Sequence, residues 1–182
     1  MKIIVSGITG SGKSTLAKIL AKKLNLEYIG ASKYLKDSLP KRDFEHWESK
    51  KGLEAIKFRL KHLQYDKKLD DFLLKKIASK KDFVLDSWVA SWKFFQKGTI
   101  KICLKSDFHT RAKRVAERDN TSLKKAADFT RKKDFLTEEI YKKLYKVDIE
   151  KDLGVFDLVV DDTHLQIKPT LDIVMTFLKN QK

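Results

Sequence analysis

The chain has 182 residues, of which 42% are hydrophobic and 36% are charged. That length suits one globular domain with a sizeable core. Its single cysteine, Cys103, excludes an internal disulfide, and because it lies in the apolar run 100–104 we expect a buried, inert thiol. No apolar stretch approaches the roughly 20 residues of a membrane span, so we expect a cytoplasmic monomer without membrane attachment.

The formal net charge of +15 is unevenly distributed: residues 1–146 carry +18, whereas residues 147–182 carry −3. A basic chain attracts polyanions, which keeps nucleic acid as a candidate partner. An enzyme that binds phosphorylated substrates also needs positive charge in its cleft. Most of the lysines alternate with Asp and Glu on the expected helix faces, which favours a solvated surface, so nucleic-acid binding is not required to explain the charge.

The first predicted element is a β-branched strand at Lys2–Ser6, which leads into the sequence GITGSGKST. This sequence fits G-x-x-x-x-G-K-[ST], and an amphipathic helix follows it, as a phosphate-binding loop requires. The alternative is a glycine-rich turn with a chance lysine. We expect Lys13 to lie along the β- and γ-phosphates of ATP and Ser14 to ligate Mg²⁺. The expected ATP-binding residues are Gly7, Ile8, Thr9, Gly10, Ser11, Gly12, Lys13, Ser14 and Thr15.

The next strands are predicted at Leu26–Ile29 and Asp82–Asp86, with a block of helices between them. In an open parallel sheet the ligand site lies at the carboxyl ends of the strands, so Asp86 should face the same crevice as the phosphate loop. A carboxylate there can join the Mg²⁺ shell. Alternatively, Asp86 caps a helix that begins near Trp88.

A fourth strand is predicted at Thr99–Leu104, and the helix after it carries Arg111, Arg114 and Arg118 on one face. Arginine suits bidentate contacts with phosphate, although ordinary pairing with neighbouring acids is the alternative. More helix follows at 121–146, then a fifth strand at Val155–Val160. The chain ends in an amphipathic helix that has Pro169 in its first turn. Five short strands interleaved with helices predict an α/β fold, a five-stranded parallel sheet flanked by helices.

The chain resembles the small nucleoside monophosphate kinases, and among them the archaeal type of cytidylate kinase. The similarity runs almost end to end, and the phosphate loop is its most specific part. The other matching segments are Asp66 and Asp70 on a long helix, Phe83–Asp86 with Ala90–Trp92, Arg111–Arg114, Tyr141–Tyr145, and Val147–Ile149 before Phe156–Val159.

The resemblance implies a single P-loop kinase domain over residues 1–182. Its core would comprise 1–30, 82–113 and 141–182, with a helical acceptor-binding block at 31–81 and a mobile lid at about 114–140. The implied reaction transfers the γ-phosphoryl group of MgATP to a nucleoside monophosphate, first of all CMP or dCMP. The alternatives are another acceptor, such as AMP or a small metabolite, and a nucleotide-dependent, RNA-associated ATPase. The expected catalytic residues are Lys13, Arg114, Arg118 and Arg131.

The acceptor half departs from the family pattern. Trp88 stands where the family has an arginine after the strand-end acid, and Asp70 is followed by Asp71 and Phe72 instead of two arginines. A lid arginine is replaced by Ile140, and an arginine of the first acceptor helix by Lys36. The residues that we expect at the acceptor are Lys36, Arg59, Asp70 and Trp88, with Arg42 and Arg131 as further candidates for its phosphate group.

Overall fold

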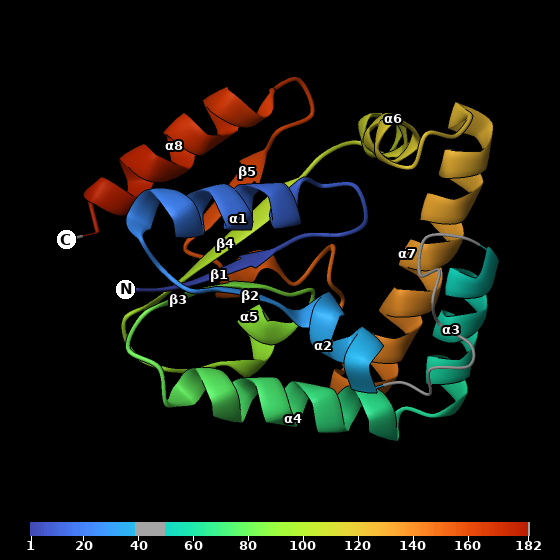
Figure 1. Ribbon diagram of the computed structural model, residues 1–182, viewed down its shortest axis with the longest axis horizontal. Coiled ribbons are helices and arrows are strands. Elements are labelled where there is room, and N and C mark those ends of the chain that lie inside the picture. The colour runs from blue at the N-terminus through green and yellow to red at the C-terminus, as the bar shows by residue number, and fades with distance from the viewer. Residues whose placement is uncertain (39–49, 182) are drawn as a thin grey trace.

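The molecule is built around a five-stranded sheet with helices on both faces (Figure 1). The computed structural model describes residues 1–38 and 50–181, and of residues 35–38 and 50–52 it describes the backbone alone. All strand pairs are parallel, in the order β2-β3-β1-β4-β5, which confirms the predicted fold class. The strands are β1 (Lys2–Ser6), β2 (Tyr28–Gly30), β3 (Phe83–Asp86), β4 (Thr99–Lys105) and β5 (Leu158–Asp161).

The helices fill the connections between these strands. They are α1 (Lys13–Leu24), α2 (Ala31–Ser38), α3 (Lys50–Lys61), α4 (Gln64–Ala78), α5 (Ala90–Lys93), α6 (Phe108–Arg118), α7 (Leu123–Tyr145) and α8 (Ile167–Lys179), with a short 3₁₀ helix η1 (Leu153–Val155).

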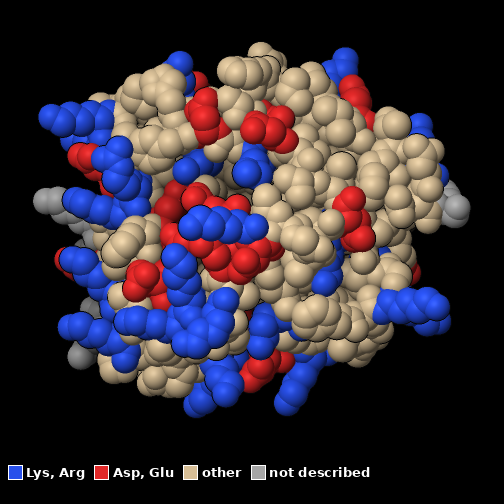
Figure 2. Space-filling model, turned by 180° about the vertical axis from the view of Figure 1, so that it is seen from behind, with Lys and Arg blue, Asp and Glu red and all other residues tan. Residues whose placement is uncertain are grey.

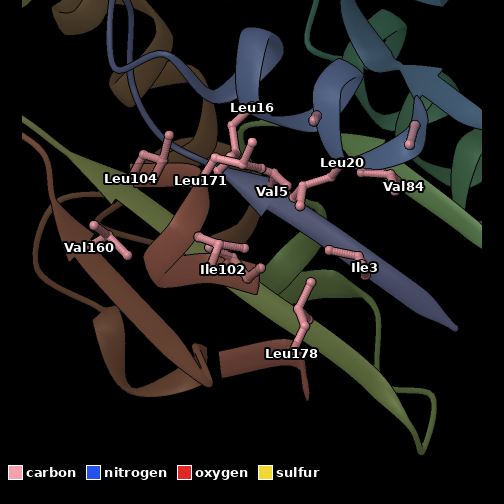
Figure 3. Close-up of a cluster of buried hydrophobic side chains, with 13 residues drawn as sticks. Ile3, Val5, Leu16, Leu20, Val84, Ile102, Leu104, Val160, Leu171 and Leu178 are labelled. Atoms are coloured by element: carbon pink, nitrogen blue, oxygen red, sulfur yellow. The ribbon is translucent and has the colours of Figure 1, made fainter. Parts of the chain in front are cut away.

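The central strand β1 is buried on both faces, because its alternate residues serve two separate cores. Ile3 and Val5 pack with α1 and α8 (Figure 3), whereas Ile4 packs with α4. All three side chains have no exposed surface. Since α1 and α4 cover opposite faces of the sheet, the carboxyl end of β1 opens into a space between them.

Two strands lie later in the chain than predicted. β2 begins at Tyr28, where its pairing with β3 starts, and not at Leu26. β5 begins at Leu158, and the preceding residues 153–155 form η1 instead of strand. Asp157 lies just before β5: its side chain accepts a hydrogen bond from the backbone N–H of Lys101 at 2.7 Å, and its own N–H donates to the backbone oxygen of Lys101 at 2.9 Å.

The predicted acceptor-binding block at 31–81 contains α2, α3 and α4. The predicted lid at about 114–140 contains the end of α6 and most of α7, a single helix of 23 residues. α7 packs against both α6 and α3. Movement of this segment, and the division of the chain into core, block and lid, stay predictions.

Cys103 is buried in β4, as predicted, and burial raises the pKa of its thiol to about 11. In the part of the chain that the structure describes, no helix combines the length and apolarity that crossing a bilayer requires. On the face opposite to that of Figure 1, Lys and Arg side chains gather on the left and lower parts, and a group of Asp and Glu side chains lies among them near the middle (Figure 2). The positive charge on this face is therefore interrupted by acidic residues.

Candidate active site

The loop between β1 and α1 is shaped as an anion cradle. Gly10 and Gly12 adopt positive φ angles of 77° and 83°, and Gly12 is the N-cap of α1. A Cβ atom on Gly10 would lie 2.6 Å from the backbone oxygen of Arg111, so this position requires glycine. The hydroxyl groups of Thr9 and Ser11 are buried without a hydrogen-bond partner among the described residues. Unpaired buried donors beside a helix N-terminus fit the phosphate groups of a nucleotide.

Lys13 is the first residue of α1 and lies at the centre of the site. Removal from water lowers the pKa of Lys13, while the nearby carboxylates of Asp86 and Asp134 act in the opposite direction. Its ammonium nitrogen lies 5.5 Å from the centre of the Trp88 ring. A partly desolvated ammonium group with acidic neighbours on two sides is placed to exchange its protein contacts for those of an anionic ligand.

Two cavities meet at this loop. The first, of about 490 Å³, lies between the loop, α6 and the segment from Asp162 to Ile167. The second, of about 650 Å³, extends from the loop to α2, α3, α4 and α7. Five residues line both cavities: Gly10, Lys13, Ser14, Thr15 and Arg118. A group that moves from a ligand in one cavity to a ligand in the other must pass these residues.

Each of the three arginines of α6 forms an ion pair with an aspartate. The alternative of ordinary pairing with acidic residues therefore applies to all three. Arg111 is buried and donates to Asp134 and, at 2.9 Å, to the backbone oxygen of Thr9. Arg111 therefore joins the phosphate loop to α7.

The other two arginines reach the cavities. Arg114 donates to Asp162 at 3.0 Å and to the backbone oxygen of Leu165 at 3.2 Å, which places its guanidinium group on the wall of the first cavity. Arg118 forms two hydrogen bonds with Asp119, at 2.6 and 2.8 Å, and lies where the cavities meet. Of the three, Arg118 is the one that lines both cavities.

Asp86 lies at the end of β3, inside the second cavity, as the strand pattern predicted. Its carboxylate is buried and accepts a hydrogen bond from the hydroxyl group of Tyr28 at 3.2 Å. Desolvation first, and then the charge and hydrogen bond of Asp86, raise the pKa of Tyr28 well above its usual value. The alternative, Asp86 as a helix cap, is not what the structure shows: the N-cap of α5 is Val89, and the backbone N–H groups of Val89 and Ala90 donate to the hydroxyl oxygen of Ser87. Asp86 and Ser14 both line the second cavity, where they could share a Mg²⁺ ion.

Two buried carboxyl groups of α4 lie in different settings, and of the two only Asp70 is on the wall of the second cavity. Asp66 accepts hydrogen bonds from the guanidinium group of Arg59, with Nε at 3.1 Å from both carboxylate oxygens. Asp70, one turn later, accepts a hydrogen bond from the hydroxyl group of Tyr145 at 2.7 Å. Arg59, Asp70 and Trp88, three of the predicted acceptor residues, all line this cavity.

One predicted residue, Arg131, is not among the residues that line the two cavities. Arg131 is exposed, and its guanidinium group lies 4.9 Å from the centre of the Phe108 ring. The buried positions of α7 are 126, 130, 137, 140 and 141, and Arg131 lies one residue out of phase with them. The side chain of Lys36 and all of Arg42 lie outside the described residues.

Other cavity residues were not predicted. Asp134 of α7 accepts a hydrogen bond from the backbone N–H of Thr9, and Lys133 and Thr137 line the second cavity. Thr137 and Asp134 lie three and six residues before Ile140, so they share the face of the helix predicted at 121–146 that carries Ile140. Lys18 and Lys33 also line this cavity and bring positive charge from α1 and α2.

A phosphate loop after the central strand of a parallel sheet, with two cavities that meet at its lysine, defines a kinase of the P-loop class. The model of the cytidylate kinase-like family matches residues 2–164, and the chain belongs to that family. This membership confirms the predicted resemblance and the predicted enzyme class, a nucleoside monophosphate kinase.

The curated relatives agree with this assignment, and the solved structures agree with the fold. The cytidylate kinase of Sulfolobus acidocaldarius is 33% identical over 175 residues, which is 96% of this chain and 92% of that protein. The cytidylate kinase of Sulfurisphaera tokodaii is 31% identical over 178 residues, 98% of this chain and 95% of that protein. A shikimate kinase from Acinetobacter baumannii has a TM-score of 0.63 at 16% identity, covering 100% of this chain and 94% of that one. A deoxyadenosine kinase from M. mycoides has a TM-score of 0.60 at 19% identity, covering 98% and 100%. At such identities the solved structures show the fold alone.

Proposed function

We propose that this enzyme transfers the γ-phosphoryl group of MgATP to CMP or dCMP, giving ADP and the nucleoside diphosphate. The observation that supports this most directly is the junction of the two cavities at Lys13 and Arg118. One cavity would hold the donor and the other the acceptor, with both phosphate ends at the loop. The relatives at 31–33% identity that cover nearly the whole chain are cytidylate kinases, which favours CMP as the acceptor.

The donor would occupy the first cavity. Its β- and γ-phosphates would accept hydrogen bonds from the backbone of residues 7–15 and from Lys13. Its base would lie between Arg114 and the segment Leu165–Ile167, which form the outer walls of that cavity. Because Arg114 is held by Asp162 and by Leu165, it fixes the shape of this wall before the donor arrives.

The acceptor would occupy the second cavity with its phosphate group near Lys13. An oxygen of this phosphate forms the new bond to the γ-phosphorus, while the bond from that phosphorus to the bridging oxygen of ADP breaks and its electron pair stays on ADP. The acceptor oxygen is already anionic, so no general base is needed. Lys13 and Arg118 would neutralise charge on the migrating group, and Lys18, Lys33 and Lys133 would attract the acceptor phosphate in place of the family arginines.

Mg²⁺ fits the residues present. In such sites Mg²⁺ binds through one or two protein oxygens together with phosphate oxygens and water. Ser14 and Asp86 supply a hydroxyl oxygen and a carboxylate oxygen on the wall of the same cavity. Among the side chains that the structure describes there is no group of three or more His, Cys, Asp or Glu ligands, and this kind of site does not need one. When bound, the ion supplies positive charge to the phosphate groups.

The test is ADP release from ATP, measured against a panel of CMP, dCMP, UMP, AMP, GMP and dTMP. We expect CMP or dCMP to accelerate ADP release most strongly. Lys13→Ala should abolish the acceleration, whereas Lys113→Ala, at an exposed position of α6, should not. Slow ADP release that no nucleotide accelerates would refute the proposal, and acceleration by a different acceptor alone would replace CMP with that acceptor.

A further inference from the structure

We propose that Asp70 selects the base of the acceptor. Its carboxyl group would pair with an exocyclic amino group and with the unprotonated ring nitrogen beside that group, and cytosine has both on one edge. This inference rests on the proposed function and names the residue that would distinguish CMP from UMP.

The residues that line the second cavity indicate which end would hold the acceptor phosphate and which the base. The acceptor phosphate must meet the donor phosphate, so it lies at the end formed by Lys13 and Arg118. The other end is lined by residues of α3, α4 and α7, among them Leu69, Asp70 and Tyr141. A nucleotide that extends away from the loop would place its base at this second end. Figure 1 shows α4 on the side of the sheet away from α1, so this end is separated from the loop.

Asp70 is the carboxyl group at this end without a basic partner. Asp66, on the same face of α4, is neutralised by Arg59. Among the described residues no Lys or Arg forms an ion pair with Asp70, and its hydrogen bond comes from the hydroxyl group of Tyr145. The side chain of Asp70 is buried, and it still lines the cavity. A buried carboxyl group that faces a ligand cavity without a basic partner is placed to pair with the ligand.

The surroundings of Asp70 favour its neutral form. Burial raises the pKa of Asp70 to about 7, and the charge of Asp66 acts in the same direction. The hydrogen bond from Tyr145 lowers the pKa of Asp70, and so do the charges of Arg59 on α3 and Lys93 on α5. The effect of burial is larger than these. The remaining neighbour is Tyr141 on α7, whose own pKa is raised, chiefly by desolvation, so that its hydroxyl group stays neutral.

A neutral carboxyl group has one donor and one acceptor side by side. Because the Tyr145 hydroxyl donates to Oδ2, the proton is retained at Oδ1, and Oδ2 keeps a second lone pair for the ligand. Cytosine matches this pair, since its ring nitrogen N3 accepts a hydrogen bond and its amino group donates one. Uracil carries N3–H and the O4 carbonyl on the same edge, which reverses the order of donor and acceptor, so its N3–H would face the proton at Oδ1. The geometry therefore favours an amino-bearing pyrimidine.

This pairing predicts a dependence on pH with a definite sign. Asp70 binds cytosine in its protonated form, so the preference for CMP should be largest below pH 7 and should decline as the pH rises above it. Asp70→Asn carries a permanent donor and acceptor at the same positions and should lose this dependence. Asp70→Ala has neither and should lose the preference itself.

The experiment measures kcat/KM for CMP and for UMP from about pH 6 to about pH 9. It compares the wild-type enzyme, Asp70→Ala, Asp70→Asn and the control Asp71→Asn, which removes an exposed carboxylate from the same helix. We expect Asp70→Ala to lower the ratio of CMP to UMP by about tenfold to hundredfold, as for the loss of one bidentate contact with a base. Asp71→Asn should leave both the ratio and its pH profile unchanged.

Each outcome decides the matter. A ratio that stays within about twofold of wild type in a folded Asp70→Ala enzyme would overturn the role of Asp70 while the proposed function stands. If Asp70→Ala does not fold, Asp70→Asn decides instead: a pH profile like that of the wild type overturns the inference, and a flat profile supports it. If no nucleotide accelerates ADP release by the wild-type enzyme, the proposed function is wrong, and this inference, which rests on it, is wrong as well.

Discussion

Asp134 of α7 accepts a hydrogen bond from the backbone N–H of Thr9 in the phosphate loop, at 3.2 Å and across 125 positions of sequence. Arg111 completes the contact by donating both to Asp134 and to the backbone oxygen of Thr9. Both backbone polar groups of Thr9 are therefore hydrogen-bonded. Its N–H donates to a carboxylate of α7, and its C=O accepts from a guanidinium group of α6.

Removing the carboxylate should destabilise the protein. In Asp134→Ala the buried guanidinium group of Arg111 loses its counter-charge, which we expect to lower the free energy of unfolding by about 3 kcal/mol. Urea denaturation measures this, with Asp128→Ala, an exposed aspartate on the same helix, as the control. Equal midpoints for the two variants would contradict a structural role for the contact.

Asp86 should set the magnesium requirement. Asp86→Asn keeps the size of the side chain and removes the charge, so the Mg²⁺ concentration that gives half-maximal turnover should rise about ten- to hundredfold. Tyr28→Phe removes only the hydroxyl group that donates to Asp86 and should have a smaller effect in the same direction. An unchanged Mg²⁺ titration of Asp86→Asn would exclude this residue from the metal shell.

Arg118 and Arg131 should differ sharply in importance. Arg118 lies where the two cavities meet, and Arg118→Ala should lower kcat by about 10²- to 10³-fold, as for other groups that stabilise charge in a transition state. Arg131 lies on the exposed side of α7 against Phe108, so Arg131→Ala should leave kcat close to that of the wild type. Steady-state kinetics at saturating ATP and acceptor compare them, and the opposite order would show that α7 turns Arg131 into the site during the reaction.

The titration of Asp70 should also be visible in stability, without any substrate. In the folded chain its pKa is about 7, whereas an unfolded chain gives aspartate a pKa near 4. Between these values the folded state keeps the proton that the unfolded state loses, so the contribution of Asp70 to the free energy of unfolding falls as the pH rises through this range. It is constant above about pH 7.

Asp70→Asn removes this contribution. The difference in unfolding free energy between the variant and the wild type should therefore grow from pH 4 to pH 7, by up to roughly 4 kcal/mol, and then level off. Urea denaturation at a series of pH values measures this difference. A difference that does not change with pH would mean that Asp70 titrates normally.

The donor half of the site was predictable because its signals are local. The phosphate loop is one continuous segment with a strand before it and a helix after it, and Asp86 lies at a strand end where parallel topology brings it to the loop. Residues 7–15 and Asp86 could therefore be placed together from sequence order alone.

The acceptor half depends on helix phase and on tertiary contacts. Arg131 and Lys133 are two residues apart, yet only Lys133 lines the second cavity, because a helix turns by about 100° per residue. Arg59 pairs with Asp66 across the short connection between α3 and α4, and not with Asp70 one turn later. Both aspartates lie on the same face of α4, so the sequence does not show which of them takes the arginine. Arg111 looked equivalent to Arg114 and Arg118, and only the fold shows that it faces α7.

α7 contacts both substrate regions: Asp134 reaches the phosphate loop, and Tyr145, eleven residues later, reaches Asp70. At 1.5 Å per residue these contacts lie about 16 Å apart along one uninterrupted helix. No break in the helix separates the two contacts. One helix therefore sets the distance between the phosphate loop at Thr9 and the buried carboxyl group of Asp70.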